Sequence, residues 1–220
     1  MPEKTPDYTL HPKVAAVLER IRKRSAAPRT AYLEQLQIME DDPDSARVFV
    51  SCSNIAHAAA GAGSDQPELL SGAKPHIGIV TSYNDMLSAH HPFASFPSDI
   101  KNALRSVGAT AQVAAGVPAM CDGVTQGQDG MELSLFSRDA IAMSAAIGLS
   151  HNVFDCAVFL GVCDKIVPGL VIAAARFGHL PAVFLPAGPM PSGLSNDEKA
   201  QVRKDFAEGK CDRDALMVAE

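Results

Sequence analysis

The chain has 220 residues, of which 47% are hydrophobic and 20% are charged, and its formal net charge is −6. This composition is typical of a folded globular protein and excludes disorder as the main state. The negative charge, the aromatic content of 5% and the absence of tryptophan argue against a protein that binds nucleic acid. No apolar run approaches the roughly 20 residues that span a bilayer, and residues 1–13 lack the apolar region of a signal peptide. We therefore expect a cytoplasmic protein without a membrane partner.

Residues 1–74 predict a helical N-terminal segment. Apolar residues recur at helical spacing between Val14 and Ile21, and Pro28 is expected to end that helix before a second one over residues 29–39. The Ala-rich residues 51–62 predict a further helix. The residues after it, up to Pro75, are rich in Gly, Pro and Ser and predict a connection.

Residues 75–195 alternate apolar runs with amphipathic stretches. Strands are expected within residues 76–85, 110–120, 154–164 and 179–188, and helices over residues 92–108, 132–150 and 165–178. This alternation is typical of a parallel sheet covered by helices. The predicted fold class is therefore α/β, with a parallel sheet flanked by helices and a helical N-terminal segment. In such sheets, ligands bind at the carboxyl ends of the strands.

Residues 196–220 form a charged segment that predicts two surface helices divided at Gly209. The sequence stops inside the second of these helices without a capping residue. We therefore expect the parent protein to be longer.

The five cysteines are scattered along the chain and odd in number, which argues against a disulfide framework. Cys52 and Cys156 are expected to pack as small hydrophobic side chains, and Cys211 is expected to be exposed. Cys121 could be a metal ligand or a small buried residue. A role as a reactive or metal-bound thiol stays open for these cysteines.

The triplet Cys163-Asp164-Lys165 follows the third expected strand. The helix that begins after it is expected to lower the pKa of the thiol. A thiolate suits iron or zinc and a carboxylate suits Mg²⁺, so the triplet suggests two different metal centres that share one site. A buried strand-end cysteine beside a surface ion pair is the simpler interpretation and stays open.

Two other loops are expected at the same edge of the sheet. The glycine-rich residues 120–131 could let the backbone approach an anion, although their spacing fits neither a Walker A nor a GxGxxG motif. Asp122 in this loop could reach a cation next to Asp164, and a plain tight loop is the alternative. His90 and His91, after the first strand, could bind phosphate or relay a proton, or they could be structural.

The runs GVPAMCDGVTQGQDGMELSLFSRDAIAMS, FLGVCDKIVPG and LPAGPMPSG together resemble the family of dihydroxy-acid and phosphogluconate dehydratases. VPAMCDGVTQGQ and SYNDMLSAHHPF point to the phosphogluconate branch. The resemblance implies the N-terminal α/β domain of a longer enzyme. It also implies removal of water from 6-phospho-D-gluconate to give 2-keto-3-deoxy-6-phosphogluconate, a step of the Entner–Doudoroff pathway.

The resemblance further implies an iron–sulfur cluster, of the 4Fe-4S type, and Mg²⁺. Cys163 matches a cysteine ligand of the family's cluster, and Asp122 and Asp164 match its Mg²⁺ carboxylates. Lys165 matches a lysine that is carboxylated and binds the metal in dihydroxy-acid dehydratases, so Asp164 and Lys165 are implied catalytic residues. Ala89 stands where relatives carry another cluster cysteine, so we expect a different ligation here.

The expected partners are a sugar-acid phosphate as substrate and a second copy in a homodimer. Two alternatives stay open. The protein could dehydrate another sugar acid or dihydroxy acids, or the chain could be a non-catalytic dimerising domain. We expect the 220-residue chain to fold but not to turn over substrate by itself.

Overall fold

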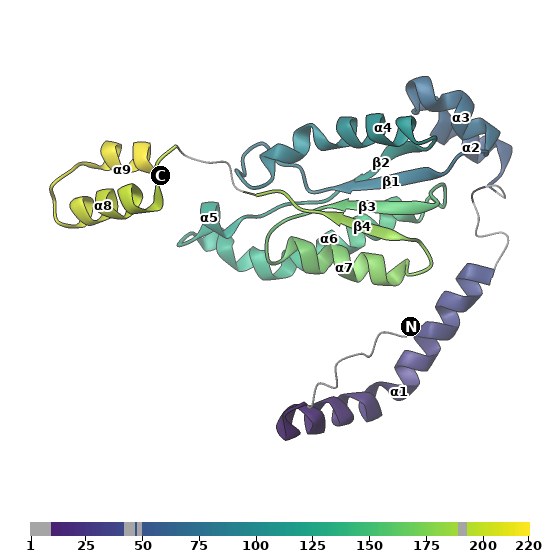
Figure 1. Cartoon of the computed structure of the whole chain (residues 1–220), viewed down its shortest axis with the longest axis horizontal. Helices are drawn as coiled ribbons and strands as arrows, with labels where there is room; N and C mark the ends of the chain where they lie inside the picture. The colour runs from purple at the N-terminus through teal and green to yellow at the C-terminus, as the bar shows by residue number, and fades with distance from the viewer. Residues whose placement is uncertain (1–9, 42–46, 48–49, 189–192) are drawn as a thin grey trace, which may run out of the picture.

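The computed structural model describes residues 10–41, 47, 50–188 and 193–220. Its centre is a parallel sheet of four strands in the order β2-β1-β3-β4 (Figure 1). The strands are β1 (His76–Thr81), β2 (Thr110–Gly116), β3 (Cys156–Leu160) and β4 (Ala182–Leu185). The predicted parallel sheet is therefore confirmed, and each predicted strand region contains one strand.

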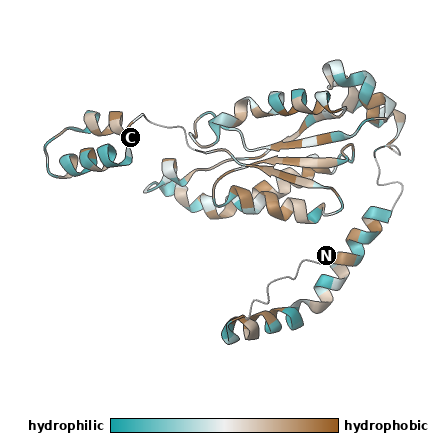
Figure 2. Cartoon of the chain, in the orientation of Figure 1, coloured by the Kyte–Doolittle hydropathy of each residue, from teal (hydrophilic) through white to brown (hydrophobic). Residues whose placement is uncertain are grey.

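Helices cover both faces of this sheet. α4 (Phe96–Ser106) lies on one face, and α6 (Leu133–Leu149) and α7 (Ile166–Arg176) lie side by side on the other (Figure 1). Hydrophobic residues are concentrated on the strands and α7 (Figure 2). Burial on both faces explains why β1 reads as an almost continuous apolar run.

Two hydrophobic clusters fill the spaces between these layers. Val80, Ile141 and Leu170 belong to the cluster between the sheet and the α6–α7 pair, whereas Ile79 and Phe93 belong to the cluster beneath α4. All five side chains are fully buried. The sheet is thus held from both sides, which fixes the positions of the loops at its ends.

The order of the strands determines where a ligand site can form. The chain runs from β1 through α4 to β2 and then returns across β1 to place β3 on the other side. Strand order therefore reverses between β1 and β3. In open α/β sheets the crevice at such a point, outside the carboxyl ends of the strands, is the usual place for ligands.

The N-terminal segment differs from its prediction. α1 (Pro12–Asp41) is one continuous helix with Pro28 inside it, so the expectation that Pro28 ends a helix was wrong. Proline costs a long helix one hydrogen bond but does not always end it. The part of α1 after Pro28 is anchored to the body, because the Tyr32 hydroxyl donates to the carbonyl of Ala175 at 2.6 Å and Leu36 lies against Gly178.

The expected connection before β1 also contains ordered helices. α2 (Cys52–Ala60) was predicted, but η3 (Gly63–Asp65) and α3 (Gln66–Ser71) were not. Pro67 stands in the first turn of α3, where its missing N–H costs nothing, and Leu69 is buried. Arg105 holds Asp65 by two hydrogen bonds of 2.7 and 2.9 Å. Tertiary contacts therefore fold a segment whose composition resembles a loop.

Short helices also occur within the predicted loops. η4 (His91–Ala94) precedes α4, and α5 (Asp122–Thr125) and η5 (Asp129–Glu132) lie in the glycine-rich loop. α8 (Asn196–Ala207) and α9 (Arg213–Ala219) are the two predicted C-terminal helices, with Gly209 between them at a φ of 70°. The division at residues 74 and 195 stays a prediction. In the described part of the chain, no helix is long and apolar enough to cross a membrane.

Candidate active site

The loops after β2 and β3 bring the predicted carboxylates together. Lys165 lies between them: its ammonium donates to Oδ2 of Asp164 at 3.0 Å and also to Oδ2 of Asp122. Asp122 is fixed from its other oxygen, since the Ser134 hydroxyl donates to Oδ1 at 2.8 Å. One cation therefore bridges two carboxylates that are 42 positions apart in the sequence.

The hydrogen bonds favour the charged forms of Asp122 and Lys165. The hydrogen bond from Lys165, followed by the one from Ser134, holds the pKa of Asp122 below its ordinary value. The hydrogen bonds to Asp122 and Asp164 raise the pKa of Lys165. Because carbon dioxide adds to a neutral amine, this state of Lys165 opposes carboxylation. The ammonium instead stands where a bound cation would contact both carboxylates.

Cys163 lies beside this group in an unusual backbone conformation. Its φ is 79°, in the left-handed region that side chains disfavour. Burial, together with the neighbouring Cys121 thiol, raises the pKa of Cys163 to about 11. The expected lowering of this pKa was wrong, because α7 begins only at Ile166 and the surroundings of the sulfur are buried and negatively charged.

His90 and His91 have different environments. His90 is completely buried, and its Nε2 lies 3.3 Å from Sγ of Cys163, whereas His91 is exposed at the start of η4. Nδ1 of His90 contacts the carbonyl and the hydroxyl of Ser82. His90 therefore reaches the site from inside the protein, next to a predicted ligand.

The side chains that could bind a metal lie in pairs, and neither pair is a complete set of metal ligands. Within the described ranges, no three His, Cys, Asp or Glu side chains are close enough together to hold a metal ion. The hard pair is Asp122 with Asp164, and the soft pair is Cys163 with His90, with Cys121 next to Cys163.

Comparison with known protein families assigns this chain to one of them. The family described as dihydroxy-acid/6-phosphogluconate dehydratase, N-terminal, matches residues 74–220. The chain belongs to this dehydratase family. The site just described lies entirely within the matched residues.

Curated relatives within the dehydratase family are strongly similar. A phosphogluconate dehydratase of Rhizobium meliloti is 59% identical over 94% of this chain and 34% of its own length. One of Pseudomonas aeruginosa is 57% identical over 96% of this chain and 35% of its own length. A dihydroxy-acid dehydratase of Akkermansia muciniphila is 37% identical over 57% of this chain and 22% of its own length. The chain thus spans about a third of the phosphogluconate dehydratases that it matches.

Sequence spacing did not reveal all the partners in this candidate site. The predictions did not contain Ser134. They gave His90 a role in phosphate binding or proton relay, or a structural role, and did not place it beside Cys163. His90 and Cys163 are 73 positions apart, so no local motif joins them. The position of Asp122 beside Asp164, in contrast, follows from the shared edge of parallel strands.

The remaining cysteines, all free thiols, give a mixed result. Cys156 packs beneath α4 as expected. Cys52 is exposed at the start of α2, so its predicted packing was wrong. Cys211 is half-buried, with its sulfur 3.7 Å from the carbonyl of Val202, so its predicted exposure was also wrong.

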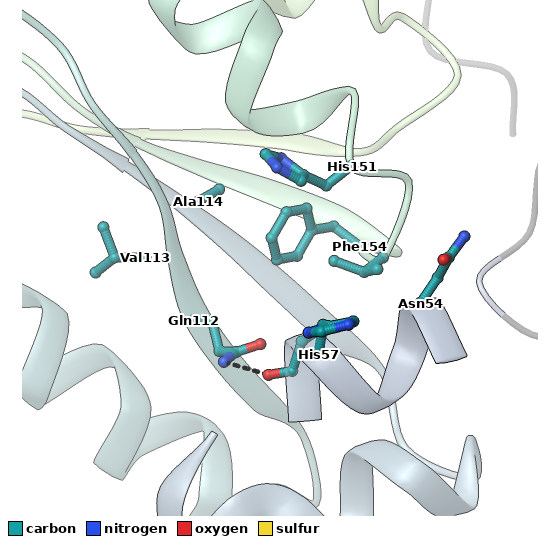
Figure 3. A pocket seen from close by; sticks show the side chains of 9 residues that line it. Asn54, His57, Gln112, Val113, Ala114, His151 and Phe154 are labelled. Carbon is teal, nitrogen blue, oxygen red and sulfur yellow. Dashed lines mark hydrogen bonds between the residues drawn. The ribbon is translucent and has the colours of Figure 1, made fainter. Parts of the chain in front are cut away.

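A hollow of about 530 Å³ lies toward the amino ends of the strands (Figure 3). His57 and Asn54 of α2 line it, together with His151 and Phe154 before β3. On its wall the amide of Gln112 donates to the carbonyl of Ala58 at 3.0 Å (Figure 3). Among the described residues that line it there is no carboxylate or thiol, and it lies away from the usual ligand edge of a parallel sheet. We therefore place the candidate site at the other end.

Proposed function

We propose that the whole protein is a 6-phosphogluconate dehydratase that converts 6-phospho-D-gluconate to 2-keto-3-deoxy-6-phosphogluconate and water in the Entner–Doudoroff pathway. Relatives named phosphogluconate dehydratase are 51–59% identical to this chain, against 37% for a dihydroxy-acid dehydratase. The observation that carries the proposal is the bridge from Asp122 through Lys165 to Asp164, next to the Cys163 thiol. A cytoplasmic location and a homodimer stay predictions.

The carboxylate pair fits Mg²⁺. Two oxygen ligands that already share one cation have the chemistry that Mg²⁺ prefers. Asp122 and Asp164 would hold the ion, and the Lys165 ammonium would leave its place between them. Lys165 would itself become a ligand only after its amine had gained a carboxyl group.

The sulfur side of the site fits an iron–sulfur cluster, which we propose to be of the 4Fe-4S type. Cys163 is a half-buried thiol with Cys121 close to it, and thiols are soft ligands suited to iron. Further ligands would come from the part of the enzyme that this chain does not span. When bound, the two groups would act as Lewis acids toward the departing C3 hydroxyl and the negative charge that develops on the carboxylate and the C2 oxygen.

The residues of this chain would position and stabilise the substrate. Loss of the C2 proton and the C3 hydroxyl gives an enol, which tautomerises to the 2-keto acid, so negative charge develops on oxygen. Once displaced from the carboxylates, the Lys165 ammonium can donate hydrogen bonds to such an oxygen. Asp164, with 72% of its side chain exposed, is free to face the substrate.

The test uses the full-length protein. Product formation should be found with 6-phosphogluconate and not with gluconate or a branched dihydroxy acid, and the opposite preference would favour the alternative substrates. Replacing Asp122 by Asn should weaken Mg²⁺ binding by about 100-fold, measured as the Mg²⁺ concentration that gives half-maximal activity. The control is Asp129→Asn, an exposed carboxylate in the same loop. Unchanged Mg²⁺ dependence in Asp122→Asn would remove Asp122 from the site.

The chain by itself offers a separate test of the alternative that it is a non-catalytic dimerising domain. The 220-residue protein, reconstituted anaerobically with iron, sulfide and Mg²⁺, is expected to show no turnover. Measurable dehydration would show that the residues described here are sufficient for catalysis.

A further inference from the structure

The helix α1 has one mainly apolar side that continues along most of its length. Residues three or four positions apart lie on the same side of a helix. Apolar, aromatic and small residues follow this spacing from the first turn of α1 to a point well beyond Pro28. These residues, which we call the α1 stripe, are Val14, Val17, Leu18, Ile21, Ser25, Pro28, Tyr32 and Leu36.

The second half of the stripe is covered by the protein's own body. Tyr32 and Leu36 are half-buried against the end of α7 and Gly178. The first half of α1, residues 12–24, lies away from the sheet and its covering helices (Figure 1), and we call it the α1 arm. The stripe residues of the arm are 37–48% exposed, and they are Val14, Val17, Leu18 and Ile21. One continuous surface is therefore covered at one end and exposed at the other.

The arm is positively charged in an acidic protein. It contains one acidic residue, Glu19, which pairs with Lys23 of the arm itself at 3.8 Å. Arg20 and Arg24 lie on one side of the stripe and Arg22 lies on the other, since each residue advances about 100° around a helix. The arm has five basic residues, whereas the net charge of the whole chain is −6, so the rest of the chain is strongly acidic.

This charge distribution indicates what the arm contacts. Two arms packed against each other would bring like charges together, whereas an arm packed on the acidic body of another copy brings opposite charges together. An exposed apolar patch with a charged border is typical of a surface that binds another protein. The covered end of the stripe adjoins the exposed end, so a second copy seated on the arm would also lie next to α7.

The comparisons place the arm outside the matched dehydratase domain. The family match covers residues 74–220, and the arm precedes it. The two phosphogluconate dehydratases match 94% and 96% of this chain, which must include most of α1. The helix that carries the arm is thus shared with these relatives but is an addition to the common domain.

We propose that the α1 arm packs its apolar side on the body of a second copy of this chain. The inference names a contact of the predicted homodimer, and it does not depend on the dehydration reaction.

The first test is photo-cross-linking of the full-length protein that carries benzoylphenylalanine at Val17. A cross-link between copies gives a band of twice the chain mass on a denaturing gel, whereas a cross-link within one chain leaves the mass unchanged. The doubled band is expected, together with a dimer in sedimentation velocity.

The second test compares two leucines of α1. Leu18→Gln should raise the dissociation constant of the dimer at least about tenfold and reduce the doubled band, because a buried leucine contributes at least this factor. The matched control is Leu33→Gln, since Leu33 is 47% exposed and lies off the stripe. This variant should leave both readouts unchanged. High salt should also weaken the wild-type dimer, because part of the contact joins opposite charges.

Several outcomes would overturn the inference. These are a monomeric wild-type protein, a cross-link found only within one chain, or equal dissociation constants for Leu18→Gln and Leu33→Gln. Binding of the full-length protein to vesicles with anionic lipid that Leu18→Gln abolishes, with an unchanged dimer, would assign the arm to a membrane surface instead. None of these readouts uses catalysis, so an active enzyme that fails them refutes the arm and leaves the proposed function intact.

Discussion

Replacing Cys163 by glycine and, in a second variant, by alanine separates the effect of backbone strain on stability from the effect of losing the sulfur. The φ of 79° costs a residue with a side chain about 1–2 kcal/mol, and glycine avoids this cost. Glycine in turn loses about 0.5–1 kcal/mol relative to alanine through conformational entropy. Both variants lack the same sulfur atom, so its burial cancels in the comparison. The glycine variant should therefore be more stable than the alanine variant by about 0.7 kcal/mol.

The assay is urea unfolding of both variants in the metal-free state, with the free energies of unfolding compared at equal m-values. The matched control is Cys156, which lies within β3 and does not have a positive φ. At that position the order should reverse, with alanine more stable than glycine by about 0.5–1 kcal/mol. The reasoning is refuted if alanine is the more stable replacement at both positions.

This contrast bears on function because the strained residue is also the predicted cluster ligand. A glycine at residue 163 would relieve the strain but would remove the thiol that faces His90. Strained residues persist where the site requires them. A Cys163→Gly protein that is at least as stable as Cys163→Ala but binds no iron would show that the fold gives up stability to place this sulfur.

Two further predictions concern the scaffold. Gly169 of α7 faces α6 so closely that a Cβ added to it would lie 2.8 Å from the carbonyl oxygen of Arg138. Gly169→Ala should therefore lower the free energy of unfolding by about 1–3 kcal/mol. The control Gly188→Ala, whose added Cβ would meet nothing within 4 Å, should leave it unchanged, and equal urea midpoints for the two variants would contradict this prediction. The hydrogen bond from Arg105 lowers the pKa of Asp65, so the stabilisation by Asp65 is complete above about pH 4 and is lost as the pH falls through the lower pKa of the folded state. Asp65→Asn should therefore be less stable than the wild type at neutral pH and equal to it in strong acid, and a stability difference independent of pH in urea unfolding would refute this.

The strands were predictable because burial in a parallel sheet leaves a local record. β1 and β3 are short apolar runs that end in polar loops, and the regions that contain them were identified without tertiary information. The helical content of residues 61–75 was not predictable in this way. It depends on the burial of Leu69 and on the pairing of Asp65 with Arg105, which is 40 positions away.

Pro28 illustrates the same limit in a helix. Its local preference is to end the helix, and the prediction followed that preference. The structure continues the helix because Tyr32 and Leu36, one and two turns later, contact the region of α7 and Gly178. Such contacts add to local hydrogen bonding and can outweigh the loss of one bond.

The composition and the order of apolar runs were thus enough to indicate a helix-covered parallel sheet and the edge at which Asp122, Cys163, Asp164 and Lys165 gather. The alternation of apolar and polar residues within each strand and helix is a local pattern, so short segments of the sequence are enough to reveal it. The charge state of Lys165, the raised pKa of Cys163 and the orientation of His90 arise from burial and from partners in other loops. Desolvation and hydrogen bonding act through space, and only the packed fold brings those partners within reach.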